Sequence, residues 1–440
     1  MTRSGTRVVI PIIVAVALTA GAVPVALGAS EPPCRVRNVT QDTTGRSFFR
    51  MVERAENGDR LRVRGACRGG VSFGVDLSIR GVGERPALAG GSGHRVLTIL
   101  AGARVALRDL RISGGDASRG CGILNEGTLL LTGSTVRFNH CGPPEWGPGG
   151  GVYNGGAMTL VDSSVRRNVA GDGGGIYNAE DGTLLMERSV VGRNVANFGP
   201  PGGHGGGIVN AGKAVLRHSL VWANDAHEGT GGIGNSGILR LRRSTVRGNK
   251  GSTGAAGGIS NGMAGITTVR HSAVVRNRGP EGPGGIGNAG RMSLIHSTIR
   301  ANEGRFGIGG VLNHGTLSLD DSSVIANEGR FGIGGVLNHG TLSLDDSSVI
   351  GNSGHRAGGI MNLGTITLGE SRVRANIARR RGGGINNDGS LDLERTRIQL
   401  NIAGIEGGGI YNGDSGTVAL DSDSSVTNNI PDDCVGTPVC

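Results

Sequence analysis

The chain has 440 residues, of which 86 are glycine and only 3% are aromatic, and its formal net charge is +10. The glycines follow no G-X-Y period, which excludes a collagen-like triple helix. Lys213 and Lys250 are the only lysines, so arginine supplies almost all of the positive charge. This charge favours anionic partners such as acidic polysaccharide, anionic cell-wall polymer or nucleic acid, although a GC-rich genome produces the same composition without any binding function.

Residues 1–30 have the pattern of a secretory signal peptide. Arg3 and Arg7 give a basic start, residues 8–27 form an apolar run, and small residues follow at 28–30. An uncleaved membrane anchor is the alternative interpretation. We expect cleavage, a secreted and extracellular mature protein, and no membrane partner after the signal is removed.

Six cysteines in an exported chain predict disulfides. Six cysteines allow about fifteen connectivities, and the sequence cannot choose among them. We expect pairing between neighbours. Metal binding is the disfavoured alternative, because no close set of Cys or His partners accompanies the cysteines. The expected bridges are Cys34–Cys67, Cys121–Cys141 and Cys434–Cys440.

Residues 31–120 are predicted to form an N-terminal cap and irregular first coils. The stretch "SFFRMVERAENGDRLRVRG" places Phe48, Val52 and Ala55 on one face of a short amphipathic helix, and a strand follows. Further strand-like segments lie at 77–80, 96–100, 105–107 and 110–113. The helix is expected to cover the exposed strand edges at this end of the molecule.

A repeat of about 25 residues fills positions 121–430. Residues 301–325 recur letter for letter at 326–350, so the fold must accept one additional whole repeat. A glycine after each G-[IV]-x-N motif starts the pattern G-x-L-x-L-x-x-S-x-V-x-x-N. The asparagines of the G-[IV]-x-N motif are Asn125, Asn154, Asn178, Asn210, Asn235, Asn261, Asn288, Asn313, Asn338, Asn362, Asn387 and Asn412.

The apolar residues alternate with polar ones inside each repeat, which indicates short strands bounded by Gly or Asn turns. No helix of useful length fits between them, so a βαβ arrangement is excluded. The sequence therefore predicts an all-β fold, a right-handed parallel β-helix with three strands per coil. Interior asparagines are expected to form ladders in which each amide donates to the next coil. Residues 431–440 would form a disulfide-closed C-terminal cap.

The repeats "GGGIYNAEDGTLLMERSVVGRN" and "GGGIYNGDSGTVALDSDSSVTNN" resemble those of secreted bacterial β-helix proteins of the pectin-lyase-like superfamily. They are also similar to the repeats of polymorphic outer-membrane proteins. The resemblance covers about residues 47–430 and implies the β-helix fold. For activity it implies several alternatives, because this superfamily contains lyases, hydrolases and adhesins.

Charged residues line one turn of the repeat. The fifth and sixth positions after the glycine carry the predicted ligand-binding residues Arg217, His218, Arg242, Arg243, Arg270 and His271. With His296 they form the basic stripe, which could bind an extended polyanion. An acidic stripe follows at Asp320, Asp321, Asp345, Asp346 and Glu370 and could bind Ca²⁺. Solvated turn charges are the alternative explanation for both stripes.

Three long loops on nearby coils provide a second candidate site. Trp146 could stack on a sugar ring, and the candidate catalytic residues are His204, Asp225, His227 and Glu228. No matched carboxylate pair at mechanistic spacing and no GGxGxDxUx Ca²⁺ motif accompanies them, so ordinary solvent loops are the alternative. Few exposed aromatic residues are expected, which argues against a specific nucleic-acid partner.

Two functions remain open at this point. The first is a secreted, monomeric, non-enzymatic rod for surface interaction or polysaccharide binding, with no cofactor. The alternative is a lyase or glycoside hydrolase acting on an acidic polysaccharide, with Ca²⁺ as a possible cofactor for a lyase. Whether the protein is an enzyme is not decided by the sequence, because a fold does not fix a function.

Overall fold

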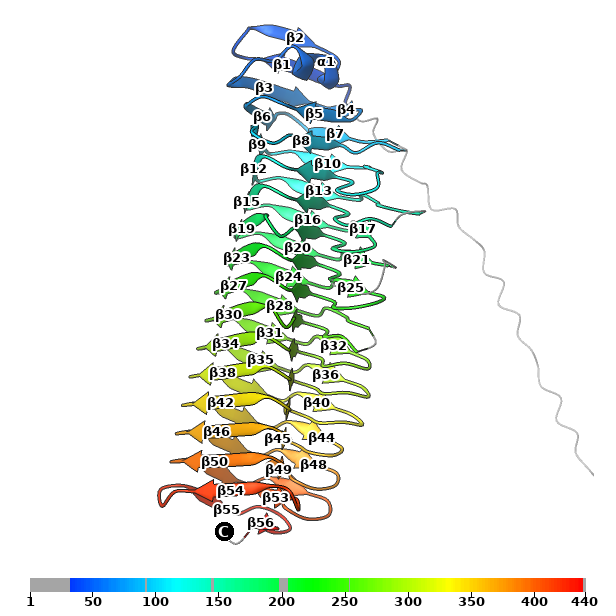
Figure 1. Cartoon of the computed structure of the whole chain (residues 1–440). Coiled ribbons are helices and arrows are strands. Elements are labelled where there is room, and N and C mark those ends of the chain that lie inside the picture. The colour runs from blue at the N-terminus through cyan, green and yellow to red at the C-terminus, as the bar shows by residue number, and fades with distance from the viewer. Residues whose placement is uncertain (1–31, 92, 144–145, 198–204, 253, 438–440) are drawn as a thin grey trace, which may run out of the picture. The chain divides into compact units, whose positions relative to one another are not determined.

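The computed structural model describes residues 32–91, 93–143, 146–197, 205–252 and 254–437. The predicted signal peptide, Glu145, His204 and Cys440 lie outside these residues. The chain divides between Glu31 and Pro32. From Pro32 onward it forms the predicted right-handed parallel β-helix, with about 25 residues per coil (Figure 1).

Sheet 1 contains the longest strand of each coil, most of them five residues long. Its first strand pairs antiparallel with β1 (Arg35–Asn38), which pairs in turn with β2 (Thr43–Gly45). The parallel strands are β3 (Asp59–Arg64), β6 (Leu77–Gly81), β9 (Arg104–Arg108), β12 (Thr128–Thr132), β15 (Ala157–Val161), β19 (Thr183–Glu187), β23 (Lys213–Arg217), β27 (Ile238–Arg242), β30 (Ile266–Arg270), β34 (Arg291–Ile295), β38 (Thr316–Asp320), β42 (Thr341–Asp345), β46 (Thr365–Gly369), β50 (Ser390–Glu394) and β54 (Thr417–Leu420).

Sheet 2 follows sheet 1 around each coil and consists of three-residue parallel strands. They are β4 (Ala66–Arg68), β7 (Ala87–Ala89), β10 (Arg111–Ser113), β13 (Thr135–Arg137), β16 (Ser164–Arg166), β20 (Val190–Gly192), β24 (Leu220–Trp222), β28 (Thr245–Arg247), β31 (Ala273–Val275), β35 (Thr298–Arg300), β39 (Ser323–Ile325), β43 (Ser348–Ile350), β47 (Arg372–Arg374), β51 (Arg397–Gln399) and β55 (Ser425–Thr427).

Sheet 3 contains the G-[IV]-x-N motif. Its strands are β5 (Val71–Phe73), β8 (Leu97–Ile99), β11 (Ile123–Asn125), β14 (Val152–Asn154), β18 (Ile176–Asn178), β22 (Ile208–Asn210), β26 (Ile233–Asn235), β29 (Ile259–Asn261), β33 (Ile286–Asn288), β37 (Val311–Asn313), β41 (Val336–Asn338), β45 (Ile360–Asn362), β49 (Ile385–Asn387), β53 (Ile410–Asn412) and β56 (Cys434–Val435).

Many coils also contain a fourth strand of two residues, between sheets 2 and 3, which the sequence did not indicate. Three of these strands form one small sheet and six form another. They are β17 (Val169–Ala170), β21 (Val195–Ala196) and β25 (Asp225–Ala226), followed by β32 (Arg278–Gly279), β36 (Glu303–Gly304), β40 (Glu328–Gly329), β44 (Ser353–Gly354), β48 (Ile377–Ala378) and β52 (Ile402–Ala403).

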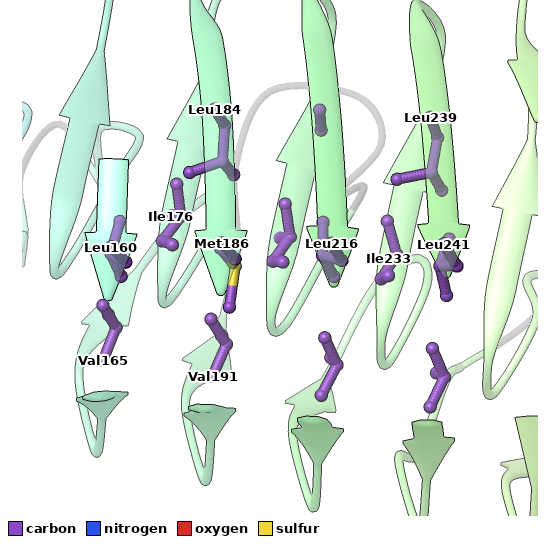
Figure 2. Close-up of a cluster of buried hydrophobic side chains, with 14 of the residues drawn as sticks. Leu160, Val165, Ile176, Leu184, Met186, Val191, Leu216, Ile233, Leu239 and Leu241 are labelled. Atoms are coloured by element: carbon purple, nitrogen blue, oxygen red, sulfur yellow. The ribbon is translucent and has the colours of Figure 1, made fainter. Parts of the chain in front are cut away.

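The core is a set of vertical columns of aliphatic side chains. One coil contributes Ile233 from sheet 3, Leu239 and Leu241 from sheet 1, and Val246 from sheet 2, all at most 1% exposed. Figure 2 shows Leu160, Met186, Leu216 and Leu241 stacked in one such column. Because every coil places the same residue types in the same columns, an added coil extends the core without disturbing it.

The duplicated segment confirms this. Asn313 pairs in register with Asn338, Leu317 with Leu342 and Val324 with Val349, so residues 326–350 form one complete coil.

Two buried asparagine ladders run through the interior, as predicted. In the first, Asn313 Nδ2 donates to Asn338 Oδ1 at 2.7 Å. In the second, Asn302 Nδ2 donates to Asn327 Oδ1 at 2.9 Å. The first ladder begins at Asn125, whose Oδ1 is buried and has no hydrogen-bond partner among the described residues. The reason is visible in the register, because the preceding coil places Ile99 at this position.

A short helix, α1 (Phe48–Glu53), lies near the start of the described chain (Figure 1). Ser47 Oγ accepts the Arg50 N–H, and Phe48, Met51 and Val52 are buried. The Phe48 ring meets Phe73 edge-on at 6.3 Å. Capping of the β-helix by this helix stays a prediction.

Two of the three predicted disulfides are confirmed. Cys34 is bonded to Cys67 and Cys121 to Cys141. The predicted Cys434–Cys440 bridge involves a residue outside the described part of the chain.

Candidate functional site

The basic stripe lies at the corner between sheets 1 and 2, where the chain turns sharply. From β9 to β50, the residue after each sheet 1 strand has a left-handed backbone, with φ of 49° at His218, 49° at Arg243 and 47° at His271. L-residues other than glycine rarely adopt this conformation. It persists here because backbone hydrogen bonds to the next coil fix it, as from the Arg243 N–H to the Arg270 carbonyl at 3.1 Å.

Buried serines fix the backbone of these corners through hydrogen bonds of their hydroxyl groups. Ser244 Oγ donates to the Arg242 carbonyl at 3.0 Å and accepts the Ser219 N–H at 3.1 Å. Ser272 Oγ makes the same bond to the Arg270 carbonyl at 2.7 Å. The serine of the repeat therefore fixes the backbone from which the stripe's side chains project. Successive coils are spaced by about 4.8 Å, the distance between neighbouring strands.

The structure brings the stripe residues together in one column, exposed to solvent. Arg217, Arg242 and Arg270 are adjacent partners at the ends of β23, β27 and β30. All seven residues of the basic stripe are exposed. The predicted outward position of this column is therefore confirmed, while ligand binding by it stays a prediction.

The two ends of the stripe are paired with carboxylates. Arg217 Nη1 lies 3.3 Å from Glu187 Oε1 in the preceding coil, and His296 Nδ1 lies 2.5 Å from Asp321 Oδ2 in the following one. Arg242, Arg243 and Arg270 form no ion pair with any described residue. The positive charge of the stripe is therefore concentrated on two adjacent coils.

The positively charged side chains around His271 affect its protonation. Its ring stacks on that of His296, with centroids 4.8 Å apart. Partial desolvation lowers the pKa of His271 below its ordinary value, and repulsion from His296, Arg270, Arg243 and Arg242 lowers it further. An anion bound among these residues would remove this repulsion.

Two arginines elsewhere along the same corner are paired with carboxylates of the preceding coil. Arg188 lies 2.8 Å from Asp162, and the hydrogen bond between them lowers the pKa of the Asp162 carboxyl. Arg395 lies 2.7 Å from Glu370. Exposed pairs of this kind contribute little stability, but they neutralise Arg188 and Arg395, unlike the arginines at the centre of the basic stripe.

The acidic stripe lines a shallow groove of about 430 Å³, which includes His296, Asp321, Asp346 and Glu370. Its floor is formed by hydroxyl side chains such as Ser323. Within the described residues, no three His, Cys, Asp or Glu side chains are grouped so that they could hold a metal ion. The suggested Ca²⁺ site stays a prediction.

Three of the four candidate catalytic residues, Asp225, His227 and Glu228, lie in the described part of the chain. Asp225 lies 3.6 Å from Lys250, its neighbour in the next coil, and its Oδ1 is buried without a hydrogen-bond partner among the described residues. His227 and Glu228 follow in an exposed turn, and His204 is outside the described residues. A catalytic role for them stays a prediction.

Trp146 packs edge-on against His140, with ring centroids 5.7 Å apart. His140 pairs with Val169, Val169 with Val195, and Val195 with Asp225. Three coil spacings therefore separate His140 from Asp225, or about 14 Å along the axis. This distance separates the aromatic residue from the candidate catalytic carboxylate.

Sequence reasoning missed a second charged surface, on the turns between the two-residue strands and sheet 3. It carries Arg305 and Phe306 and, one coil later, their duplicates Arg330 and Phe331. The Phe306 and Phe331 rings stack at 5.4 Å. The signal was present in the duplicated "EGRFG" segment, where a phenylalanine next to an arginine stands in a variable turn.

No protein-family model matches the chain, and neither a curated protein nor a solved structure matches it significantly. No helix in the described part of the chain is long and apolar enough to span a membrane.

Proposed function

We propose that this protein is a secreted, non-enzymatic β-helical rod that binds an acidic polysaccharide or another anionic cell-wall polymer along the basic stripe. The main support is the cluster of Arg242, Arg243 and Arg270, which no described carboxylate neutralises. The two disulfides are compatible with an oxidising, extracellular location. Descent from pectin-lyase-like proteins is part of the proposal and depends on the repeat pattern alone.

The geometry suits an extended polymer better than a small ligand. The guanidinium groups repeat with the coil spacing along a straight column, and arginine binds carboxylate and sulfate groups through paired hydrogen bonds. The corners are fixed by serine and backbone hydrogen bonds. Little conformational order therefore has to be gained on binding, apart from that of the arginine side chains.

The test is binding of fluorescently labelled polygalacturonate to the chain beginning at Pro32, measured at several salt concentrations. Arg242→Gln/Arg270→Gln should weaken binding by roughly tenfold per arginine, because each removes a charged hydrogen bond. Arg188→Gln/Arg395→Gln is the matched control, since it removes the same charge from arginines that already have carboxylate partners. Equal losses in both variants would contradict the proposal.

The same samples distinguish binding from catalysis. Chain shortening of the polysaccharide, with or without Ca²⁺, would show the protein to be an enzyme. If Asp225→Asn or His227→Ala abolished that shortening, the active site would be assigned to the long loops.

A further inference from the structure

A row of exposed apolar and basic side chains runs along the two-residue strands of the C-terminal coils and the turns that follow them. These strands, β36, β40, β44, β48 and β52, belong to one small parallel sheet, and the labelled ones are stacked along one edge of the solenoid in Figure 1. We call this surface the loop edge. It comprises Arg305, Phe306, Arg330, Phe331, Arg356, Ile377, Arg379, Arg380, Ile402, Ile405 and Ile430.

The apolar members of the loop edge are large and exposed to solvent. Phe306 is 56% exposed, Phe331 47%, Ile405 52% and Ile430 60%. Contiguous exposed apolar residues of this size mark an interaction surface more often than chance. Nothing in the described part of the chain covers them, so they are available to a partner.

Register places these residues in two columns, one in which Phe306 and Phe331 are followed by basic residues and then Ile405, and one in which Ser353 is followed by three isoleucines. Ile377 pairs with Ile402, and Ile402 with Ile430. The Phe331 N–H donates to the Arg305 carbonyl at 3.1 Å, and the Ile405 N–H to the Arg380 carbonyl at 2.8 Å. The row therefore crosses six coils, or roughly 25–30 Å at the strand spacing.

The loop edge is also fixed in place. Ile308 and Ile333 fold back and are buried in a small second cluster with Ala357, packed against Leu312 and Leu337 on the outside of sheet 3. Isolated bridges connect Ile308 to Ile333 and Ile333 to Ala357. The turns thus form an ordered, straight row, which can touch a flat surface at every coil.

The charge of the loop edge is positive. Arg305, Arg330, Arg356, Arg379 and Arg380 form no ion pair with any described residue. Against these five stand Glu281 and Glu328 and, in the last turn beside Ile430, Asp432 and Asp433, which are likewise without an ion pair among the described residues. Asp432 accepts the Gly407 N–H and Asp433 accepts the Asn429 side-chain amide, so the positive charge lies on the coils from Arg305 to Arg380. Glu303 and Glu406 are neutralised by Arg278 at 2.9 Å and Arg381 at 2.6 Å. The complementary surface is therefore anionic.

We propose that the loop edge binds the surface of an anionic phospholipid bilayer. Phe and Ile side chains can enter the boundary between headgroups and acyl chains, while the arginines contact lipid phosphates. Aliphatic isoleucines would gain nothing by stacking on sugar rings, so the surface suits lipid better than polysaccharide. This inference departs from the expectation that the mature protein has no membrane partner, and it does not depend on the proposed function of the basic stripe.

The test is flotation of the chain beginning at Pro32 with vesicles of phosphatidylglycerol and phosphatidylcholine in equal amounts, and with vesicles of phosphatidylcholine alone. We expect binding to the anionic vesicles only. Arg379→Gln/Arg380→Gln should lower the partition coefficient roughly 25-fold, or fivefold per arginine. Phe306→Ser/Phe331→Ser should lower it at least tenfold.

Matched controls use other faces of the same solenoid. Arg372→Gln/Arg374→Gln removes two exposed arginines from β47 in sheet 2. Phe138→Ser/Leu400→Ser removes two exposed apolar side chains from another corner. Both should bind vesicles like the unchanged protein, as should Arg242→Gln/Arg270→Gln.

Equal losses in the control and loop-edge variants would overturn the proposal, because binding would then reflect net charge alone. Failure to bind anionic vesicles would also overturn it. If an acidic glycan were instead retained through Arg379 and Arg380, the edge would be assigned to carbohydrate. Far-UV circular dichroism of each variant separates these outcomes from unfolding.

Discussion

The asparagine ladders allow a quantitative prediction about stability. In the second ladder, Asn302 Oδ1 accepts the Asn277 backbone N–H at 2.9 Å and Asn277 Nδ2 at 3.0 Å. Its own Nδ2 donates to the Val274 carbonyl at 3.0 Å and to Asn327 Oδ1 at 2.9 Å. Asn302→Ala removes all four bonds and leaves the Asn277 N–H buried without an acceptor. At about 1 kcal/mol per bond, the expected loss is about 3–5 kcal/mol in free energy of unfolding.

The assay is urea unfolding followed by far-UV circular dichroism, with hydrogen exchange at the Asn277 amide as a local readout. Exchange matters because a solenoid can open a few coils at a time rather than unfold in one step. Ser293→Ala, on the half-exposed outer face of β34 in the same coil, is the control and should change stability by less than about 0.5 kcal/mol. A loss below about 1 kcal/mol for Asn302→Ala would show that the ladder contributes little.

Two further predictions concern the duplicated coil and the basic stripe. Deletion of residues 326–350 removes one whole coil and should leave a folded β-helix that is about 5 Å shorter by small-angle scattering. Deletion of residues 326–337 removes half a coil and should unfold the neighbouring coils. Unfolding of the variant that lacks 326–350 would contradict the register. His271 should titrate below the ordinary histidine range in an NMR pH series. Folding stability should therefore fall as the pH drops from the ordinary histidine pKa to the lower pKa of folded His271, because the unfolded state binds more protons than the folded state in that interval. Polygalacturonate should raise the pKa of His271, and binding should tighten at lower pH; an unchanged pKa would place the ligand elsewhere.

The repeat made the fold predictable, because each of its restraints recurs in every coil. Alternating residues such as Leu317 and Leu319 define a strand, and Asn313 and Asn338 must be vertical neighbours once the period is known. The disulfides Cys34–Cys67 and Cys121–Cys141 were expected on separate grounds, as pairs of neighbouring cysteines in the sequence.

The variable turns were less predictable, because no repeated pattern restrains them. The two-residue strands and the buried Ile308 and Ile333 depend on how each turn folds back onto sheet 3. The basic stripe was located correctly, but its pairing was not anticipated. Glu187 stands at the position equivalent to Arg217 one coil earlier and neutralises it, so the arginines without carboxylate partners form a smaller group than the sequence suggested.

In both asparagine ladders, each side-chain amide donates one N–H towards the C-terminus, to the Oδ1 of its partner in the next coil. Each ladder is therefore a series of aligned dipoles with unlike ends, one that needs an acceptor and one that can bind a donor. At the C-terminal end, each ladder ends on an acceptor. The Gly436 carbonyl accepts a hydrogen bond from Asn412 Nδ2 at 3.0 Å, and the Asp433 carboxylate accepts one from Asn429 Nδ2 at 2.9 Å. At the N-terminal end of the second ladder, the Gly115 N–H donates to Asn139 Oδ1. A shortened or fused version of this molecule would therefore need an acceptor where each ladder stops, whatever the number of coils between, whereas the start can lack a protein donor, as at Asn125 among the described residues.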